Sequence, residues 1–175
     1  HEKHQIISTS TCTGNAFAPI ANFIDQNFGI SNGFLSTIHP LLSNEKMIDG
    51  FNKSFGLGRG ARNIKLTPTS ITKSTLAVLP HLKNKISETS LSYRIPTDIV
   101  SAVYGILVLD KFVSSDHFFD LLNKEIKDGK LKGIIDLCDG LFGHSKVSLD
   151  YLKDTNSGII DKKWVECKDN LIRLH

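Results

Sequence analysis

One apolar stripe near the N-terminus constrains the fold more than any other feature of the chain. Its members, spaced as on one face of an α-helix, are Phe17, Ile20, Phe23, Ile24 and Phe28. The apolar pair Ile6-Ile7 before the stripe predicts a short strand, and Gly29 predicts that the helix ends near Phe28. The chain therefore passes from strand to helix within a run of hydroxyl residues, and Cys12 falls at the helix start.

The middle of the chain carries fewer periodic signals. We expect a strand over residues 30–38 that ends at His39, followed by a long ordered loop with short elements over 41–66. The residues 67–70 have the composition of a helix start, and Pro80 ends the apolar face that follows. Loops of this length are usually either functional or disordered.

The second half of the chain contains more predicted strands than predicted helices. Segments 90–96 and 99–109 are predicted to be two strands of an antiparallel sheet, and a helix capped at Ser114 ends at Gly129. Further short strands are expected over 131–137, 147–152, 157–161 and 164–174. These elements predict one α+β domain over residues 1–175, with helices packed on one face of a mainly antiparallel sheet.

Composition excludes several classes of function. The 175 residues carry a net charge of +3 with scattered Lys and Arg, which favours a phosphate-bearing small molecule over a nucleic-acid groove. No apolar run is long enough for a membrane span. The three cysteines, Cys12, Cys138 and Cys167, have no metal-ligand spacing. We therefore expect a cytoplasmic protein without disulfides or a structural metal.

The chain carries no glycine-rich fingerprint of a dinucleotide-binding fold. The run Gly56-Leu57-Gly58-Arg59-Gly60 lies in the middle of the expected loop, and no βαβ pattern follows it. The chain also begins without methionine and leads directly into the predicted strand, which indicates a domain from a longer protein. We expect that this domain alone binds no dinucleotide.

Cys12 has the setting of a reactive thiol. Unpaired backbone N–H groups at a helix start favour the thiolate and can hold a small anion. The local sequence is equally compatible with a small buried cysteine near a helix cap. His39, at the end of the next strand, is compatible with a general base and with an ordinary hydrogen-bonded histidine.

A family resemblance rests on the run from Ser10 to Pro19, which reads Ser-Thr-Cys-Thr-Gly-Asn-Ala-Phe-Ala-Pro. This run resembles the active-site segment of the phosphorylating glyceraldehyde-3-phosphate dehydrogenases, in which the cysteine is the nucleophile. Gly14 takes the place of the family's second threonine, and Ala16 takes the place of its second cysteine. His39, in Ser-Thr-Ile-His, has the context and the separation of the family's catalytic histidine.

The same resemblance implies a phosphate site. Arg94, in Tyr-Arg-Ile-Pro-Thr, matches an arginine that grips phosphate in the family, and guanidinium binds a phosphate dianion through two parallel bonds. Thr13 and Thr69 match threonines that hydrogen-bond phosphate. Thr11 takes the position of the serine before the cysteine, and Ser70 replaces a glycine. A hydroxyl at such a position is also an ordinary helix cap.

The resemblance extends from Lys3 to the last residue and implies a function for the whole protein. That function is the NAD- or NADP-dependent oxidation of a sugar-phosphate aldehyde, with inorganic phosphate as second substrate, in a homo-oligomer. The NAD-binding Rossmann domain is absent from this chain, so the isolated chain is expected to be inactive. The resemblance implies neither a membrane partner nor a nucleic-acid partner.

Several positions depart from the family pattern. Leu42 and Asn44 replace a threonine and an aspartate, and the run from Phe55 to Leu57 offers no arginine. An apolar residue at the Leu42 position also occurs in erythrose-4-phosphate dehydrogenases, so this substrate stays open. A non-catalytic relative that acts as an interaction module stays open as well.

These interpretations predict a geometry. The Cys12 sulfur should lie within contact range of the His39 ring. Thr11, Thr13, Thr69 and Arg94 should surround one cavity beside Cys12. The apolar residues of the loop, which in the family pack against a neighbouring subunit, should lack cover: Leu41, Leu42, Met47, Ile48, Phe51, Phe55 and Leu57. Either this loop is mobile, or the chain pairs with a second copy through the sheet or the loop.

Overall fold

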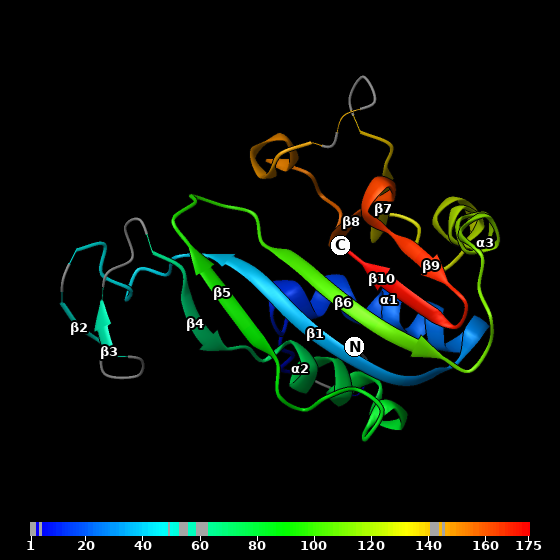
Figure 1. Ribbon diagram of the computed structural model, residues 1–175, viewed down its shortest axis with the longest axis horizontal. Helices are drawn as coiled ribbons and strands as arrows, with labels where there is room; N and C mark the ends of the chain where they lie inside the picture. The colour runs from blue at the N-terminus through cyan, green and yellow to red at the C-terminus, as the bar shows by residue number, and fades with distance from the viewer. Residues whose placement is uncertain are drawn as a thin grey trace.

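Six strands form the main sheet of the protein, whose computed structural model describes residues 3, 5–48, 50–52, 56–58, 63–140, 144 and 146–175. Across the sheet their order is β4 (Lys65–Pro68), β5 (Leu91–Ile95), β1 (Ile30–Pro40), β6 (Ala102–Leu109), β10 (Leu171–Leu174) and β9 (Glu166–Lys168) (Figure 1). Two smaller pairs join β2 (Gly50–Asn52) to β3 (Gly56–Gly58) and β7 (Ile135–Cys138) to β8 (Gly158–Asp161). The helices of the described residues are α1 (Cys12–Phe28), α2 (Ile71–Val78) and α3 (Ser115–Asp128), with the 3-10 helices η1 (Pro80–Leu82), η2 (Ser148–Tyr151) and η3 (Lys162–Trp164).

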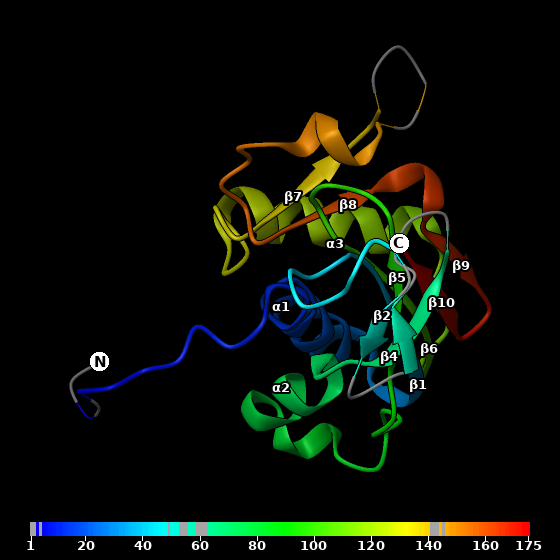
Figure 2. The same cartoon turned by 90° about the vertical axis from the view of Figure 1, so that its left-hand side faces the viewer.

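The main sheet is antiparallel except where β1 meets β5. The predicted strands over 90–96 and 99–109 form as β5 and β6, but they are not neighbours, because β1 lies between them. Alternation in the sequence identifies a strand without identifying its partner. The helices lie on one face of this sheet (Figures 1 and 2), so the predicted α+β class is confirmed.

The helix α1 forms the centre of the core. Its apolar stripe is buried, with Ile24 fully inaccessible, and it contacts β1 and β6 on one side and β7 and β8 on another. The ring of Phe23 meets the ring of Phe118 from α3 edge to face, at 5.9 Å between centroids. Gly29 ends the helix at φ 71°, a left-handed conformation that favours glycine. The predicted bounds of α1 are therefore confirmed.

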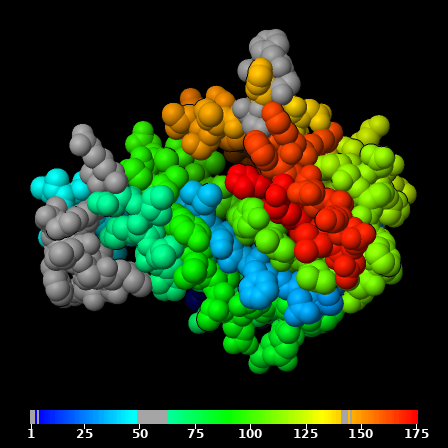
Figure 3. Space-filling model, viewed as in Figure 1, coloured from blue at the N-terminus to red at the C-terminus, as the bar shows by residue number. Residues whose placement is uncertain are grey.

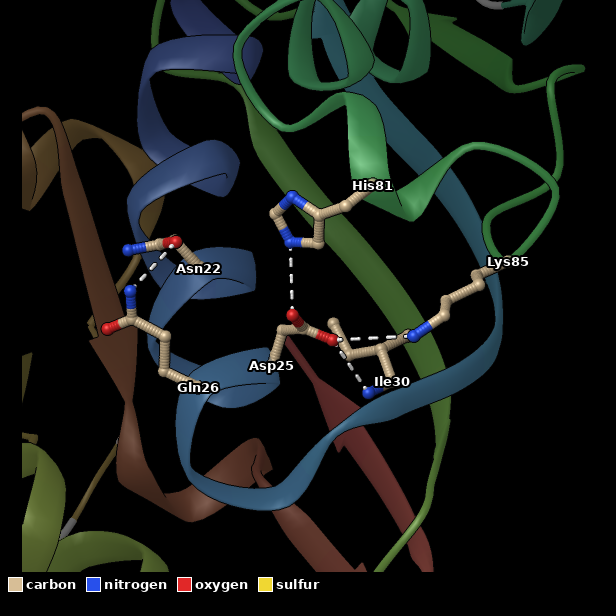
Figure 4. Close-up of polar contacts among 6 residues, drawn as sticks. All are labelled: Asn22, Asp25, Gln26, Ile30, His81 and Lys85. Carbon is tan, nitrogen blue, oxygen red and sulfur yellow. Dashed lines mark hydrogen bonds and ion pairs between the residues drawn. The ribbon is translucent and has the colours of Figure 1, made fainter.

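A polar cluster holds the C-terminal end of α1 (Figure 4). The Asp25 carboxylate accepts a hydrogen bond of 3.0 Å from the Ile30 backbone N–H, and it lies 3.0 Å from His81 Nε2. Lys85 Nζ lies 3.8 Å from the same carboxylate. This one side chain therefore connects α1 with the first residue of β1 and with the segment after α2.

Among the described residues, no helix lies over the opposite face of the sheet (Figure 1). In Figure 3 the strands β1, β6 and β10 are open to the viewer. Phe34 on this face is 68% exposed, and Leu91 and Tyr93 of β5 are also exposed. The register places Leu91 opposite Ser36 and Tyr93 opposite Ile38, in the same outward-facing set as Phe34.

Three strand predictions are wrong. Ile6 and Ile7 form no strand: they are largely exposed, in a segment that runs away from the body (Figure 2) with no strand beside it in the described residues. Instead of the strand expected over 147–152, the residues Ser148–Tyr151 form the 3-10 helix η2, because the Asp150 carboxylate accepts the Val147 N–H at 2.9 Å. The expected strand over 164–174 is two strands, β9 and β10, separated by a turn at Asp169.

The other predictions for the second half hold in outline. The helix expected from Ser114 is α3, and the Ser114 hydroxyl accepts the N–H of His117 at 3.3 Å. Of the expected strand over 131–137, only the part from Ile135 pairs, with β8. Within the described residues, none of the helices combines the length and apolarity that a membrane crossing requires.

Candidate active site

Thr11 forms the N-cap of α1 and so sets the position of Cys12. Its backbone is extended, its hydroxyl accepts the N–H of Gly14 at 3.2 Å, and its carbonyl accepts the N–H of Asn15 at 2.9 Å. The N–H groups of Cys12 and Thr13 lie in the first turn, where no intrahelical acceptor exists. The thiol is exposed, so Cys12 stands at the positive end of a helix with access to solvent.

His39, next to the end of β1, faces this thiol. Its Nε2 lies 3.9 Å from Cys12 Sγ, which confirms the predicted contact. Its Nδ1 lies 2.7 Å from the carbonyl oxygen of Pro40. A carbonyl oxygen can only accept, so Nδ1 carries the hydrogen, and Nε2 of the neutral ring presents its lone pair to the sulfur. This tautomer can take the proton of the thiol.

Arg94 lies directly beside His39, as its register partner on β5. Its Nε donates to the hydroxyl of Thr67 at 3.2 Å. Its Nη1 is buried without a hydrogen-bond partner among the described residues. On the other side of Arg94, the register partner on β4 is Lys65. A guanidinium with a free, buried donor is suited to an anion.

The remaining predicted phosphate residues lie at two helix starts. Thr13 is buried in α1, at 5% exposure. Thr69 and Ser70 precede α2, where the Thr69 hydroxyl accepts the N–H of Ile71 at 3.4 Å and Ser70 makes no side-chain cap bond. The two helix starts are joined, because the hydroxyls of Thr11 and Ser74 lie 3.2 Å apart.

A cavity of about 470 Å³ opens beside Cys12. Cys12 and Thr13 line it, together with Tyr151 and residues of β8. Thr11, Thr69 and Arg94 do not, so the predicted single cavity around all four residues is not found. Arg94 instead follows the inner face of its sheet toward Thr67.

The Tyr151 phenol in this cavity wall is neutral at pH 7. Burial, a hydrogen bond with Cys138 and the charges of Asp161 and Asp150 raise its pKa above the usual value. Within the described residues, no group of three His, Cys, Asp or Glu side chains could hold a metal ion.

The loop after β1 exposes part of its predicted apolar set. Leu42, Met47 and Ile48 are exposed, and Leu41 is half-buried. Phe55 and Arg59 lie outside the described residues, as do the side chains of Phe51 and Leu57. Glu45, by contrast, is buried at 8% exposure and lies 3.7 Å from Lys65.

Comparison with known proteins identifies the family. The profile described as "Glyceraldehyde 3-phosphate dehydrogenase, C-terminal domain" matches residues 11–174. The chain belongs to this family. It is 39% identical to the glyceraldehyde-3-phosphate dehydrogenase of Lactarius deterrimus over 161 residues, which are 91% of the chain and 53% of that protein. It is 37% identical to the cytosolic enzyme of Ginkgo biloba over 172 residues, which are 97% of the chain and 48% of that protein.

A third relative, glyceraldehyde-3-phosphate dehydrogenase 2 of Caenorhabditis elegans, is 37% identical over 163 residues, which are 92% of the chain and 46% of that protein. The chain thus spans about half the length of the curated relatives it matches. The resemblance of the active-site run is confirmed as family membership.

Sequence reasoning missed three residues of this glyceraldehyde-3-phosphate dehydrogenase domain that contact the predicted site. Ser74 holds the cap of α1, and Lys65 with Glu45 forms an ion pair beside Arg94. The spacing of Lys65 and Thr67 could have predicted that both side chains lie on one face of a strand, since residues two apart on a strand share a face. Glu45 and Ser74 gave no such signal.

Proposed function

We propose that this chain is the catalytic half of an NAD(P)-dependent phosphorylating aldehyde dehydrogenase that acts on glyceraldehyde 3-phosphate. The observation that carries the proposal is the pair of Cys12 and His39, with Sγ and Nε2 3.9 Å apart at the start of α1. The relatives are named as glyceraldehyde-3-phosphate dehydrogenases, which supports the same substrate.

The proposed reaction begins at the sulfur of Cys12. His39 Nε2 takes the thiol proton, and the thiolate forms a bond to the aldehyde carbon. The N–H groups of the first turn of α1, including that of Thr13, can stabilise negative charge that develops on the aldehyde oxygen. His39 then returns the proton to that oxygen, which completes the hemithioacetal, and takes it back when the carbon loses its hydride and the thioester carbonyl forms. Inorganic phosphate finally attacks the thioester and releases Cys12 as the leaving group.

NAD or NADP, when bound, would accept the hydride. The described part of this chain offers no glycine-rich turn between a strand and a helix that could hold a dinucleotide. We therefore place the cofactor in a Rossmann domain outside this chain, and we expect the isolated chain to be inactive.

Two sets of residues are proposed to bind phosphate. Arg94 would hold the phosphate of the aldehyde through its free Nη1. Thr11, Thr13, Thr69 and Ser70 would bind inorganic phosphate at the two helix starts, which the bond between Thr11 and Ser74 brings together.

We further propose a cytoplasmic homo-oligomer, without membrane or nucleic-acid partners. The uncovered sheet face with Phe34 and Tyr93, and the exposed Met47 and Ile48, are apolar surfaces of the kind that subunit contacts cover. The relatives from Ginkgo biloba and Pisum sativum are named as cytosolic.

Two alternatives have their own support. Leu42 leaves erythrose 4-phosphate open as the aldehyde, because erythrose-4-phosphate dehydrogenases also have an apolar residue at this position, and kinetics with both aldehydes would distinguish the two substrates. Gly14 and Asn44 depart from the family pattern, as expected for a non-catalytic relative that serves as an interaction module.

The decisive experiment measures alkylation of Cys12 by iodoacetamide as a function of pH in the full-length protein. We expect rapid labelling well below pH 7 in the wild type. In His39→Ala the pH at which labelling is half-maximal should rise to about 8.5, the value of an ordinary thiol. Cys167 is an internal control in the same digest, because burial raises its pKa and should slow its labelling. If Cys12 of the wild type is labelled with the pH dependence of an ordinary thiol, the result would support the non-catalytic alternative.

A further inference from the structure

Three basic side chains occupy one row across three neighbouring strands. The register pairs His39 of β1 with Arg94 of β5, and Arg94 with Lys65 of β4. The next row along the same strands consists of Thr37, Ser92 and Thr67, which are at most 5% exposed. Because residues two apart on a strand share a face, the three basic residues point to the same buried side of the sheet.

The two cations on β5 and β4 are incompletely paired. The Lys65 side chain is 10% exposed, and its Nζ has no hydrogen-bond partner among the described residues. Among the described residues its nearest carboxylate oxygen, Glu45 Oε1, is 3.7 Å away, while Glu45 Oε2 accepts the N–H of Leu42 at 2.8 Å. Arg94 Nη1 is likewise buried and without a partner in the described part of the chain. Each of these two neighbouring cations therefore keeps a buried nitrogen without a hydrogen-bond partner among the described residues.

Such an arrangement is unfavourable unless an anion completes it. Like charges directly opposite on paired strands repel each other, and a buried donor without an acceptor loses its hydration without compensation. A phosphate group supplies two negative charges and several acceptor oxygens, enough for Arg94 Nη1 and Lys65 Nζ together.

We propose that Lys65 is a second cation for the phosphate of the aldehyde substrate, acting beside Arg94. Glu45 holds the Lys65 ammonium in position and partly neutralises it when the phosphate is absent. This inference rests on the proposed function, and it names the residue that compensates for Leu42 and Asn44 at the substrate-phosphate end of the site.

The distance across the sheet agrees with this role. Neighbouring strands lie about 4.8 Å apart, so a phosphate between Arg94 and Lys65 lies roughly 5–10 Å from the strand of His39. A chain of three or four carbons can bridge that interval and leave its aldehyde carbon at Cys12. Inorganic phosphate, by contrast, is assigned to the helix starts, so the two phosphate sources are separable.

The test is Lys65→Met in the full-length protein, with Lys73→Met, an exposed lysine of α2, as the matched control. We expect the variant to raise KM for glyceraldehyde 3-phosphate about ten- to a hundredfold. KM for inorganic phosphate, and kcat/KM for unphosphorylated glyceraldehyde, should remain unchanged. Lys65→Arg should restore most of the loss, and Lys73→Met should behave as the wild type.

A binding measurement keeps this test independent of catalysis. Calorimetry with glycerol 3-phosphate, an unreactive phosphomonoester, should give a Kd weakened by the same factor in Lys65→Met. If Lys65→Met leaves Glu45 unpaired and the protein does not fold, the double variant Lys65→Met/Glu45→Gln removes that charge and repeats the comparison.

The outcomes separate the two proposals. A wild type that oxidises no aldehyde, yet loses glycerol 3-phosphate affinity on Lys65→Met, refutes the proposed function and supports the phosphate role of Lys65. Equal affinity in wild type and Lys65→Met, or a wild type that binds no phosphomonoester, overturns the inference. Lys65 would then serve only as the counter-ion of Glu45.

Discussion

Gly14 is the position at which one added methyl group should be felt most directly by the active-site helix. A Cβ placed on Gly14 would lie 2.7 Å from Ser74 Oγ and 2.8 Å from Thr11 Oγ1. It would also lie 3.2 Å from Ser74 Cβ. The substitution Gly14→Ala therefore strains both the packing of α1 against α2 and the hydroxyl that caps α1 ahead of Cys12.

The magnitude follows from three opposing contributions. Alanine improves on glycine in a helix by about 1 kcal/mol. Overpacking costs about 1–3 kcal/mol, and loss of the Thr11 cap bond costs about 1 kcal/mol. The net expectation for Gly14→Ala is a loss of about 1–3 kcal/mol in the free energy of unfolding. For a domain of this size each kcal/mol lowers Tm by about 2–4 °C.

Denaturant unfolding of the full-length protein measures this loss, and the double variant Gly14→Ala/Ser74→Ala provides the matched comparison. Removing Ser74 Oγ abolishes the closest contact, at 2.7 Å. Gly14→Ala should therefore cost less free energy of unfolding when it is added to Ser74→Ala than when it is added to the wild type. A Gly14→Ala protein that is more stable than the wild type would refute the reasoning, because helix propensity would then outweigh the steric contacts.

Two further substitutions test the core and the polar cluster. Phe118→Ala should lower the free energy of unfolding by about 3–5 kcal/mol, since Phe118 is fully buried against Phe23, and a loss below about 1 kcal/mol would contradict that packing. Asp25→Ala should cost about 1–3 kcal/mol because it leaves the buried Ile30 N–H without its acceptor, whereas His81→Ala, at an exposed ion pair, should cost below about 1 kcal/mol. Equal losses at these two positions would show that the ion pair, not the backbone bond, dominates the cluster.

The sequence by itself determined the features that depend on neighbouring residues. The bounds of α1 followed from its apolar stripe and from Gly29, and the start of α3 followed from Ser114. Caps and stripes act within a few residues of the chain, so they can be recognised without knowledge of the rest of the fold. The contact between Cys12 and His39 was also predictable, through the resemblance of both segments to one family.

Only the tertiary structure decided which distant segments meet. It placed β1 between β5 and β6, and it put Lys65 opposite Arg94. It also left Ile6 without a partner strand in the described residues, although the residue type favours one. The physical reason is that a strand's hydrogen bonds and opposed side chains come from segments remote in sequence. Alternation therefore shows which side chains share a face of the strand, but it does not show which strand lies beside it.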